Sequence, residues 1–238
     1  MAQKIKYNLR SKIKSEGFFF TWGSNILNNI KDLDSFKDLI KEYDNLPIDK
    51  YTREEDGLRY RRFARLLLNP KDMSIKPLDS SSFYQSKYIN KKYGGIKRRF
   101  AQISKKTLNN KFLKNLVIFN FNNLLVSKTS SESWEVGIHM IRIVTKAGKK
   151  GRPAPEGVHK DGHDFISIQL IKKENIKGGI SKIFNKDKEI VMRKTLKNPM
   201  DSLYINDKKM FHYASIFNPL NKEKDGTRDI LIMNFNRK

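Results

Sequence analysis

Two histidines and one aspartate are spaced so that their side chains could hold one metal ion. His159 and Asp161 are two residues apart, and in an extended chain side chains at that spacing point to the same side. A third candidate ligand, His212, lies in a later segment with the composition of a strand. Two imidazoles and one carboxylate, with the other coordination positions open, form the usual oxygen-activating Fe(II) site. The sequence therefore makes His159, Asp161 and His212 candidate iron ligands.

An arginine follows this set at the start of the last strand-like segment. Arg228 comes 16 residues after His212 and directly before the mainly apolar run 229–235. A guanidinium can hold a carboxylate through two parallel N–H donors, so Arg228 could bind a carboxylate ligand beside the metal. Taken singly, His212 could be a hydrogen-bonded core histidine and Arg228 a surface ion-pair partner. The order of these groups on successive β-prone segments favours the metal site.

The composition excludes several classes of site. The chain has 238 residues, with 49 Lys+Arg against 25 Asp+Glu, a net charge of +24, and no cysteine. The absence of cysteine excludes disulfides, thiolate zinc sites, iron–sulfur clusters and a cysteine nucleophile. Positive charge favours nucleic-acid binding through counterion release, but these lysines are spread along the chain and form no basic tail. The sequence therefore favours a solvated basic surface over a nucleic-acid partner.

The sequence also gives no sign of a membrane segment. No apolar run approaches the roughly 18 residues that a helix needs to cross a bilayer. The first 14 residues are basic, but the apolar segment Phe18 to Phe20 that follows is too short for the core of a signal peptide. We therefore expect a cytoplasmic protein with no membrane partner.

Hydrophobic periodicity divides the chain into a helical first part and a β-rich second part. The pattern predicts helices over 3–15, 24–46 and 110–126 and a strand or hairpin arm over 58–68. After residue 134, β-prone runs separated by Gly and Pro occur at 135–145, 164–171, 180–184, 189–194, 202–206, 210–216 and 229–236. Many short strands with such turns are typical of a sandwich or barrel. We expect an α+β protein of one domain, 1–238, in which a helical part of about 1–130 packs on a jelly roll of about 131–238.

Several motifs in the second part resemble those of a known enzyme family. They are Gly137 to Arg142, Pro155 to Phe165, Asn175 to Gly179, Phe211-His212 and Arg228 to Leu231. Weaker similarity extends upstream, through Arg59 to Arg65, Phe83 to Ser86 and Gly94 to Arg98. In these segments and in their order, the chain is similar to the bacterial 2-oxoglutarate/Fe(II)-dependent dioxygenases that hydroxylate free amino acids.

This resemblance implies a double-stranded β-helix core and a reaction that uses Fe(II), 2-oxoglutarate and O2. His159, Asp161 and His212 would be the iron ligands, and Arg228 would bind the distal carboxylate of 2-oxoglutarate. Hydroxylation of the substrate would be accompanied by the release of succinate and CO2.

A zwitterionic amino acid needs a cation for its carboxylate and an acceptor for its ammonium group. Arg142, on the strand before the metal motif, is the candidate substrate-binding cation, and a salt bridge at the rim of the site is the alternative. His139 alternates to the opposite face from Arg142 in an ideal strand, so the two should not line one pocket unless a bulge intervenes.

Other polar groups near these motifs have two interpretations. His163 and Asp164 could orient the metal ligands or could be polar groups of a turn. A cluster of arginines could cover the site, but we expect it to decorate an edge strand instead. The cluster consists of Arg59, Arg61, Arg62 and Arg65.

The leading interpretation is a dioxygenase that hydroxylates a free L-amino acid with an aliphatic side chain. The same chemistry on a peptide, a protein or a nucleic acid is one alternative, which the net charge of +24 allows. A basic nucleic-acid-binding module that keeps a jelly roll without turnover is the other. Succinate formation that depends on particular free amino acids would separate the first interpretation from both.

Overall fold

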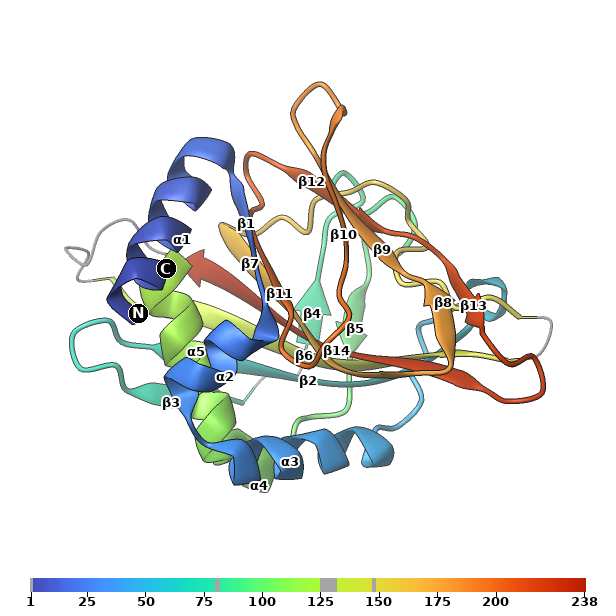
Figure 1. Ribbon diagram of the computed structural model, residues 1–238, viewed down its shortest axis with the longest axis horizontal. Helices are drawn as coiled ribbons and strands as arrows, with labels where there is room; N and C mark the ends of the chain where they lie inside the picture. Colours follow the sequence, from blue (N-terminus) through green and yellow to red (C-terminus); the bar gives the residue numbers. More distant parts are fainter. Residues whose placement is uncertain (1, 80–81, 125–131, 147–148) are drawn as a thin grey trace.

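The structure is a computed structural model that describes residues 2–79, 82–124, 132–146 and 149–238. Its main features are two antiparallel sheets, one of seven strands and one of three. They form the two layers of a jelly roll, and helices lie against the outer side of the larger sheet (Figure 1). This architecture confirms the predicted α+β class and jelly-roll core.

The larger sheet has the strand order β1-β11-β7-β14-β6-β2-β3. Its strands are β1 (Phe18–Thr21), β2 (Leu58–Leu68), β3 (Ile75–Leu78), β6 (Trp134–Thr145), β7 (Phe165–Glu174), β11 (Ser202–Asn206) and β14 (Gly226–Arg237). β6 pairs antiparallel with β2 and β14 on its two sides. Directly opposite side chains point to the same side of a sheet, so this register places Arg59, Ile143 and Arg228 in one row.

The smaller sheet has the order β10-β9-β12. Its strands are β9 (Ile180–Phe184), β10 (Ile190–Thr195) and β12 (Phe211–Ala214). Two further pairs are β8 (Ile176–Gly178) with β13 (Phe217–Pro219), and β4 (Ser82–Tyr84) with β5 (Lys97–Arg99). A single β-bridge joins His159 to His212, so the segment between β6 and β7 is tied to β12.

Helices α1 (Ala2–Glu16), α2 (Gly23–Ile30), α3 (Leu33–Lys41) and α5 (Lys111–Leu124) cover the outer face of the larger sheet (Figure 1). The shorter helical elements are α4 (Lys105–Leu108) and the 3-10 helices η1 (Glu42–Asn45) and η2 (Glu54–Asp56). Phe112 of α5 packs in one core with Ile138 and Met140 of β6. Because side chains alternate along a strand, Ile141 and Ile143 of β6 point the other way and line the pocket described below. Within the described ranges, no helix combines the length and the apolarity needed to span a bilayer.

The predicted helix 24–46 is three shorter elements, α2, α3 and η1. Lys31 ends α2 with a φ of 51°, and Asp32 caps α3 by accepting a hydrogen bond from the Ser35 N–H at 3.2 Å. These two polar residues therefore break the helix that the apolar spacing favours. The strand predicted at 58–68 is β2, and the helix predicted at 110–126 is α5, which ends at Leu124, the last described residue there.

The predicted helical first part also supplies three strands of the larger sheet, of which the sequence predicted only the one at 58–68. β1, β2 and β3 come from the first part, yet all three belong to the larger sheet. The seam predicted near residue 130 lies outside the described residues.

The prediction that the arginine-rich strand β2 is an edge strand is wrong. β6 pairs with it on one side, and β3 pairs with its residues 65–68 on the other. Further along that second side, the carbonyls of Pro47 and Ala101 accept hydrogen bonds from the N–H groups of Arg61 and Phe63, at 2.8 and 2.9 Å. β2 is therefore an interior strand, and its side chains alternate between the two faces of the sheet.

Candidate active site

A pocket lies between the two sheets of the jelly roll. Residues of β2, β6, β7, β11 and β14 form one wall and residues of β9 and β12 another, and the segments 83–98 and 153–161 complete the lining. All three candidate iron ligands and Arg228 line it. The fold thus brings together in one cavity the four groups that the sequence singled out for metal and carboxylate binding.

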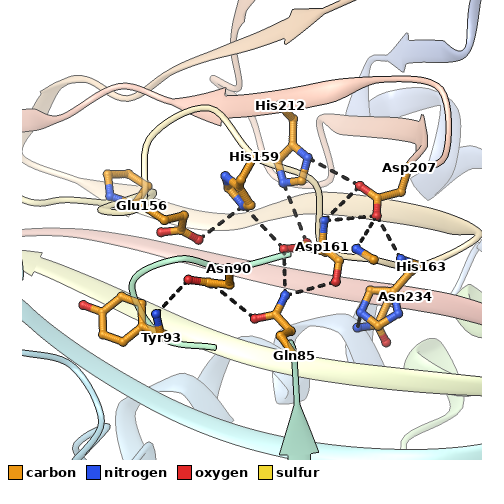
Figure 2. Close-up of polar contacts among 12 residues, drawn as sticks. Gln85, Asn90, Tyr93, Glu156, His159, Asp161, His163, Asp207, His212 and Asn234 are labelled. Carbon is orange, nitrogen blue, oxygen red and sulfur yellow. Dashed lines mark hydrogen bonds and ion pairs between the residues drawn. The ribbon is translucent and has the colours of Figure 1, made fainter. Parts of the chain in front are cut away.

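The two histidines and the aspartate face one another at short range (Figure 2). The backbones of His159 and His212 exchange two hydrogen bonds, at 3.1 and 2.9 Å, and their ring centroids are 4.3 Å apart. The carboxylate oxygens of Asp161 are 3.4 Å from His159 Nε2 and 3.7 Å from His212 Nε2. One ligand atom from each residue lies within 4.8 Å of the others, so a single ion could contact all three.

The charges and hydrogen bonds within the triad favour a bound cation. His159 Nδ1 is 2.9 Å from the Gly157 carbonyl oxygen, which can only accept, so Nδ1 carries a proton and Nε2 is left for a metal. Burial lowers the pKa of His159, but the hydrogen bond to Asp161 and the charge of Glu156 outweigh it and raise that pKa to about 9. Burial and then the charge of His159 lower the pKa of His212 to about 4. Burial raises the pKa of Asp161, but the two imidazoles hold it well below its ordinary value. Without a metal the triad thus holds a proton on His159 beside the ionised Asp161, and a metal cation would take the place of that proton.

Asp207 holds the metal motif through its backbone. Its buried carboxylate accepts hydrogen bonds from the N–H groups of Asp161 at 3.0 Å, Gly162 at 2.6 Å and His163 at 2.9 Å. Gly162 has a φ of 86°, a left-handed conformation that glycine adopts without strain. No sequence pattern marks Asp207, because it contacts backbone atoms of a segment 44 to 46 residues away.

Gln85 supports the same motif from the segment after β4. Its Nε2 donates to the Asp161 carbonyl oxygen at 3.1 Å, and its Oε1 accepts from Arg98 at 2.8 Å and from Asn90 at 3.3 Å. Figure 2 shows Gln85 pointing toward the aspartate from the side opposite to Asp207. Gln85 therefore connects the metal motif to Arg98 on β5. The sequence alone did not predict this connection.

Arg228 is a buried cation without an anionic partner. Its side chain on β14 is only 3% exposed, and no carboxylate in the described part of the chain forms an ion pair with its guanidinium. Burial lowers its pKa to about 10. A buried charge without a partner is unfavourable, so an anion that entered the pocket would be stabilised there.

The candidate substrate cation, Arg142, lies outside the pocket, and that prediction is corrected here. Its Nε and Nη2 donate to the two carboxylate oxygens of Asp229 at 2.7 and 2.8 Å, and Nη2 also contacts Asp44 at 2.9 Å. The alternation of β6 turns Arg142 toward the helices, as it does Met140, whereas His139 lines the pocket. Strand alternation correctly predicts that Arg142 and His139 lie on opposite faces of β6. The pocket lies on the face of His139, not on the predicted face of Arg142.

Three other arginines line the pocket instead. Arg59 and Arg61 come from the inner face of β2, and Arg98 comes from β5. The expectation that this cluster decorates a strand edge holds for neither Arg59 nor Arg61. The remaining two point elsewhere: Arg62 donates to the Gln102 carbonyl oxygen at 2.8 Å, and Arg65 donates to Glu135 at 2.7 Å.

The roles left open for His163 and Asp164 are settled by their contacts. The ring of His163 lies 2.8 Å from Asn234 Nδ2 and 2.9 Å from Asn236 Nδ2, both on β14. Asp164 forms an ion pair with Lys208 and accepts a hydrogen bond from the Arg237 N–H at 2.9 Å. Both side chains therefore connect the turn before β7 to neighbouring segments. Neither contacts the imidazoles of His159 and His212.

Comparison with known proteins agrees with this geometry. The profile of the 2OG-Fe dioxygenase family matches residues 41–234. The chain is 28% identical to L-isoleucine-4-hydroxylase of Bacillus thuringiensis over 201 residues, which cover 80% of this chain and 81% of that protein. It is 25% identical to 3(1)-hydroxy-L-isoleucine 4-dioxygenase of Pantoea ananatis over 211 residues, covering 86% and 82%. A solved bsmA homolog from Methylobium petroleophilum PM1 has a TM-score of 0.85 over 97% of this chain and 92% of that one, at 22% identity, and shows the shared fold.

The region that matches the family contains the His–Asp–His set and Arg228. Enzymes of this family use Fe(II), 2-oxoglutarate and O2, and two imidazoles with one carboxylate are donors that suit Fe(II). The chain therefore belongs to the 2OG-Fe dioxygenase family and is a 2-oxoglutarate-dependent iron dioxygenase.

Proposed function

We propose that the protein hydroxylates a free L-amino acid with an aliphatic side chain. The observation that carries the proposal is the arrangement of one pocket, in which the triad His159, Asp161 and His212 shares a cavity with the unpaired Arg228. Two relatives, an isoleucine hydroxylase and a hydroxyisoleucine dioxygenase, support an aliphatic amino acid as the substrate.

In this proposal the triad holds Fe(II) and Arg228 binds the distal carboxylate of 2-oxoglutarate. When bound, Fe(II) supplies the activation of O2. One oxygen atom enters the substrate C–H bond to give an alcohol, and the other enters 2-oxoglutarate, which loses CO2 and becomes succinate. The chain itself contributes the binding and orientation of the two organic molecules.

Apolar side chains lie beside Arg228 on the wall of the pocket that the larger sheet forms. Ile143 is its direct neighbour on β6, and Ile141, Ile168 and Ile230 also line the cavity. Among the described residues no carboxylate pairs with the guanidinium, and charges interact more strongly in an apolar environment than in water. This wall therefore favours a carboxylate on Arg228 and keeps water away from the reacting atoms.

The test is a turnover assay with a panel of amino acids. Protein loaded anaerobically with Fe(II) and 2-oxoglutarate is exposed to air with each proteinogenic L-amino acid, and succinate is measured together with a product heavier by one oxygen atom. We expect equal amounts of both products with aliphatic L-amino acids. Samples without 2-oxoglutarate, and the His212→Ala variant, should form neither.

Other outcomes would contradict the substrate. If succinate rises only with peptides, proteins or nucleic acids, the reaction class holds and the free amino acid is wrong. If no substrate raises succinate and the protein binds DNA in a salt-sensitive way, the interpretation as a binding module replaces it.

A further inference from the structure

Arg59, Arg61 and Arg98 lie on the pocket wall with too few carboxylates to neutralise them. Arg61 is 3.7 Å from Asp49. Arg98 donates to the neutral amide of Gln85, and Arg59 donates to two backbone carbonyls. Two of the three guanidiniums thus have no carboxylate within ion-pair distance among the residues that the structure describes.

Each of these arginines also has a buried donor that is unused. The Nε atoms of Arg59, Arg61 and Arg98 are buried without a hydrogen-bond partner. Arg61 and Arg98 are themselves 9% and 5% exposed. A buried donor left without an acceptor is destabilising, so the pocket-lining arginines are under-satisfied, and an anion in the pocket would be stabilised by their guanidiniums.

Aromatic rings fix the positions of two of these guanidiniums. The Arg61 guanidinium lies 4.2 Å from the ring centroid of Phe100, and that of Arg98 lies 5.0 Å from Phe83. Arg61 Nη2 is also 2.8 Å from Nδ1 of the buried His139. The donors are therefore held in place before any ligand enters, which reduces the entropy lost on binding.

One carboxylate of the pocket has no assigned role. Of the described residues that line the cavity, Glu156 and Asp161 are the acidic ones, and Asp161 belongs to the triad. Glu156 Oε1 lies 3.3 Å from His159 Nε2 (Figure 2). Among the described residues no lysine or arginine lies within ion-pair distance of this carboxylate, so it can accept hydrogen bonds from a cationic group of a ligand in the pocket.

This subsite is separate from the one at Arg228. In the registers of β2, β6 and β14, Arg59 and Arg228 lie on the two sides of Ile143. Strands are spaced about 4.8 Å apart, so the two backbones are roughly 10 Å from each other. A small dicarboxylate on Arg228 therefore leaves the arginines of β2 and β5 free for a second molecule.

We infer that Arg59, Arg61 and Arg98 bind the α-carboxylate of the substrate and that Glu156 binds its α-ammonium group. The inference rests on the proposed function. It explains selectivity for free α-amino acids by recognition of both charged groups, the α-carboxylate and the α-ammonium. A blocked carboxylate would leave the arginine donors unfilled, and a blocked amine would leave Glu156 without a cation.

The test compares a substrate with its two blocked forms. The probes are L-isoleucine, or the most active amino acid of the panel if that differs, its α-amide and its N-acetyl derivative. We expect kcat/KM to fall at least about tenfold for each blocked form, because each loses a hydrogen-bonded charge pair. If both blocked forms react within threefold of the free amino acid, the inference is wrong and the hydroxylase function stands. If no amino acid supports succinate formation, the proposed function itself fails.

Variants test the two halves of the subsite. Glu156→Gln and Arg98→Lys should raise KM for the amino acid about tenfold to a hundredfold, with KM for 2-oxoglutarate unchanged. Matched controls are Glu223→Gln, at an exposed position, and Arg62→Lys, on the outer face of β2. The absorption of the anaerobic Fe(II)–2-oxoglutarate complex reports an intact metal site. Loss of that absorption in Glu156→Gln would make Glu156 a metal ligand and overturn its assignment, as would an unchanged KM in both variants.

Discussion

Both carboxylate oxygens of Asp207 lie within hydrogen-bond distance of the Asp161 N–H, at 3.1 and 3.0 Å. The same carboxylate accepts from the next two N–H groups and lies 3.9 Å from His212 Nδ1. Asp207 thus contacts the triad at two places that are far apart in the sequence. A buried acceptor and a single β-bridge, rather than a regular strand, hold the His159–Asp161 segment beside β12.

Replacing Asp207 with asparagine should weaken iron binding. An amide has one acceptor oxygen in place of two, and its NH2 group would face the N–H donors of the metal motif. We expect the Kd for Fe(II) to rise about tenfold to a hundredfold and the free energy of unfolding to fall by about 1–3 kcal/mol. Anaerobic iron titrations and urea unfolding measure the two effects. The exposed Asp187→Asn is the control, and equal iron affinity in both variants would exclude a positioning role for Asp207.

The sequence predicted the triad because its chemistry depends on side-chain type. The His-x-Asp spacing places two ligands on one side of an extended segment, and a third histidine on a later strand completes a set that suits Fe(II). Asp207 and Gln85 were not found, because they act on backbone atoms of the motif. Any residue type can present an N–H or a carbonyl, so such contacts leave no pattern in the sequence.

Arg142 shows what the pattern alone could not decide. Alternation along β6 separates its two faces, but only the positions of the helices and the smaller sheet decide which face lines the pocket. Likewise, the role of Arg59 and Arg61 depends on the pairing of β2 with β6, two strands that are distant in the sequence. The register between strands that are distant in the sequence depends on the packing of the whole domain, so the sequence alone could not place these two arginines.

Arg142→Met should destabilise the fold without changing substrate binding. It would leave the carboxylate of Asp229, which is fully buried, without its guanidinium partner. We expect a loss of about 3–5 kcal/mol in the free energy of unfolding and an unchanged KM for the amino acid. Burial raises the pKa of Asp229 and Arg142 opposes that rise, so the variant should lose more stability at pH 8 than at pH 5.

A second substitution checks the cause of that loss. Adding Asp229→Leu replaces the ion pair with apolar groups and should recover much of the stability in urea unfolding. A raised KM for the amino acid in Arg142→Met would instead return this arginine to the substrate site.

Arg228→Met should separate cofactor binding from stability. The variant removes a buried cation that has no anionic partner in the described part of the chain, so unfolding of the metal-free protein should be no easier than in the wild type. KM for 2-oxoglutarate should rise roughly a hundredfold, because two charge-assisted hydrogen bonds are lost. Steady-state kinetics with 2-oxoglutarate and thermal unfolding measure the two effects. Arg193→Met, on the exposed strand β10, is the control, and an unchanged KM would remove Arg228 from the 2-oxoglutarate site.

Iron binding should release a proton from His159. The pKa of this imidazole is raised to about 9, against the effect of burial, by its hydrogen bond to Asp161 and the charge of Glu156. In the metal-free protein His159 is therefore protonated at neutral pH, and the metal must displace that proton from Nε2. His212 is already neutral there, because burial lowers its pKa to about 4. Asp207, whose pKa is raised to about 6 by burial and then by Asp161, is ionised above neutral pH.

The affinity for Fe(II) should consequently rise about tenfold per pH unit between pH 7 and 8.5, with about one proton released per iron. Above the pKa of His159, near pH 9, the affinity should level off because no proton is left to displace. Anaerobic titrations at several pH values measure the slope, and an indicator in weak buffer counts the protons. Glu156→Gln removes a charge that helps to raise the pKa of His159. In this variant the affinity for Fe(II) should therefore stop rising at a lower pH. An affinity independent of pH over this range would show that Nε2 is not the atom that iron takes.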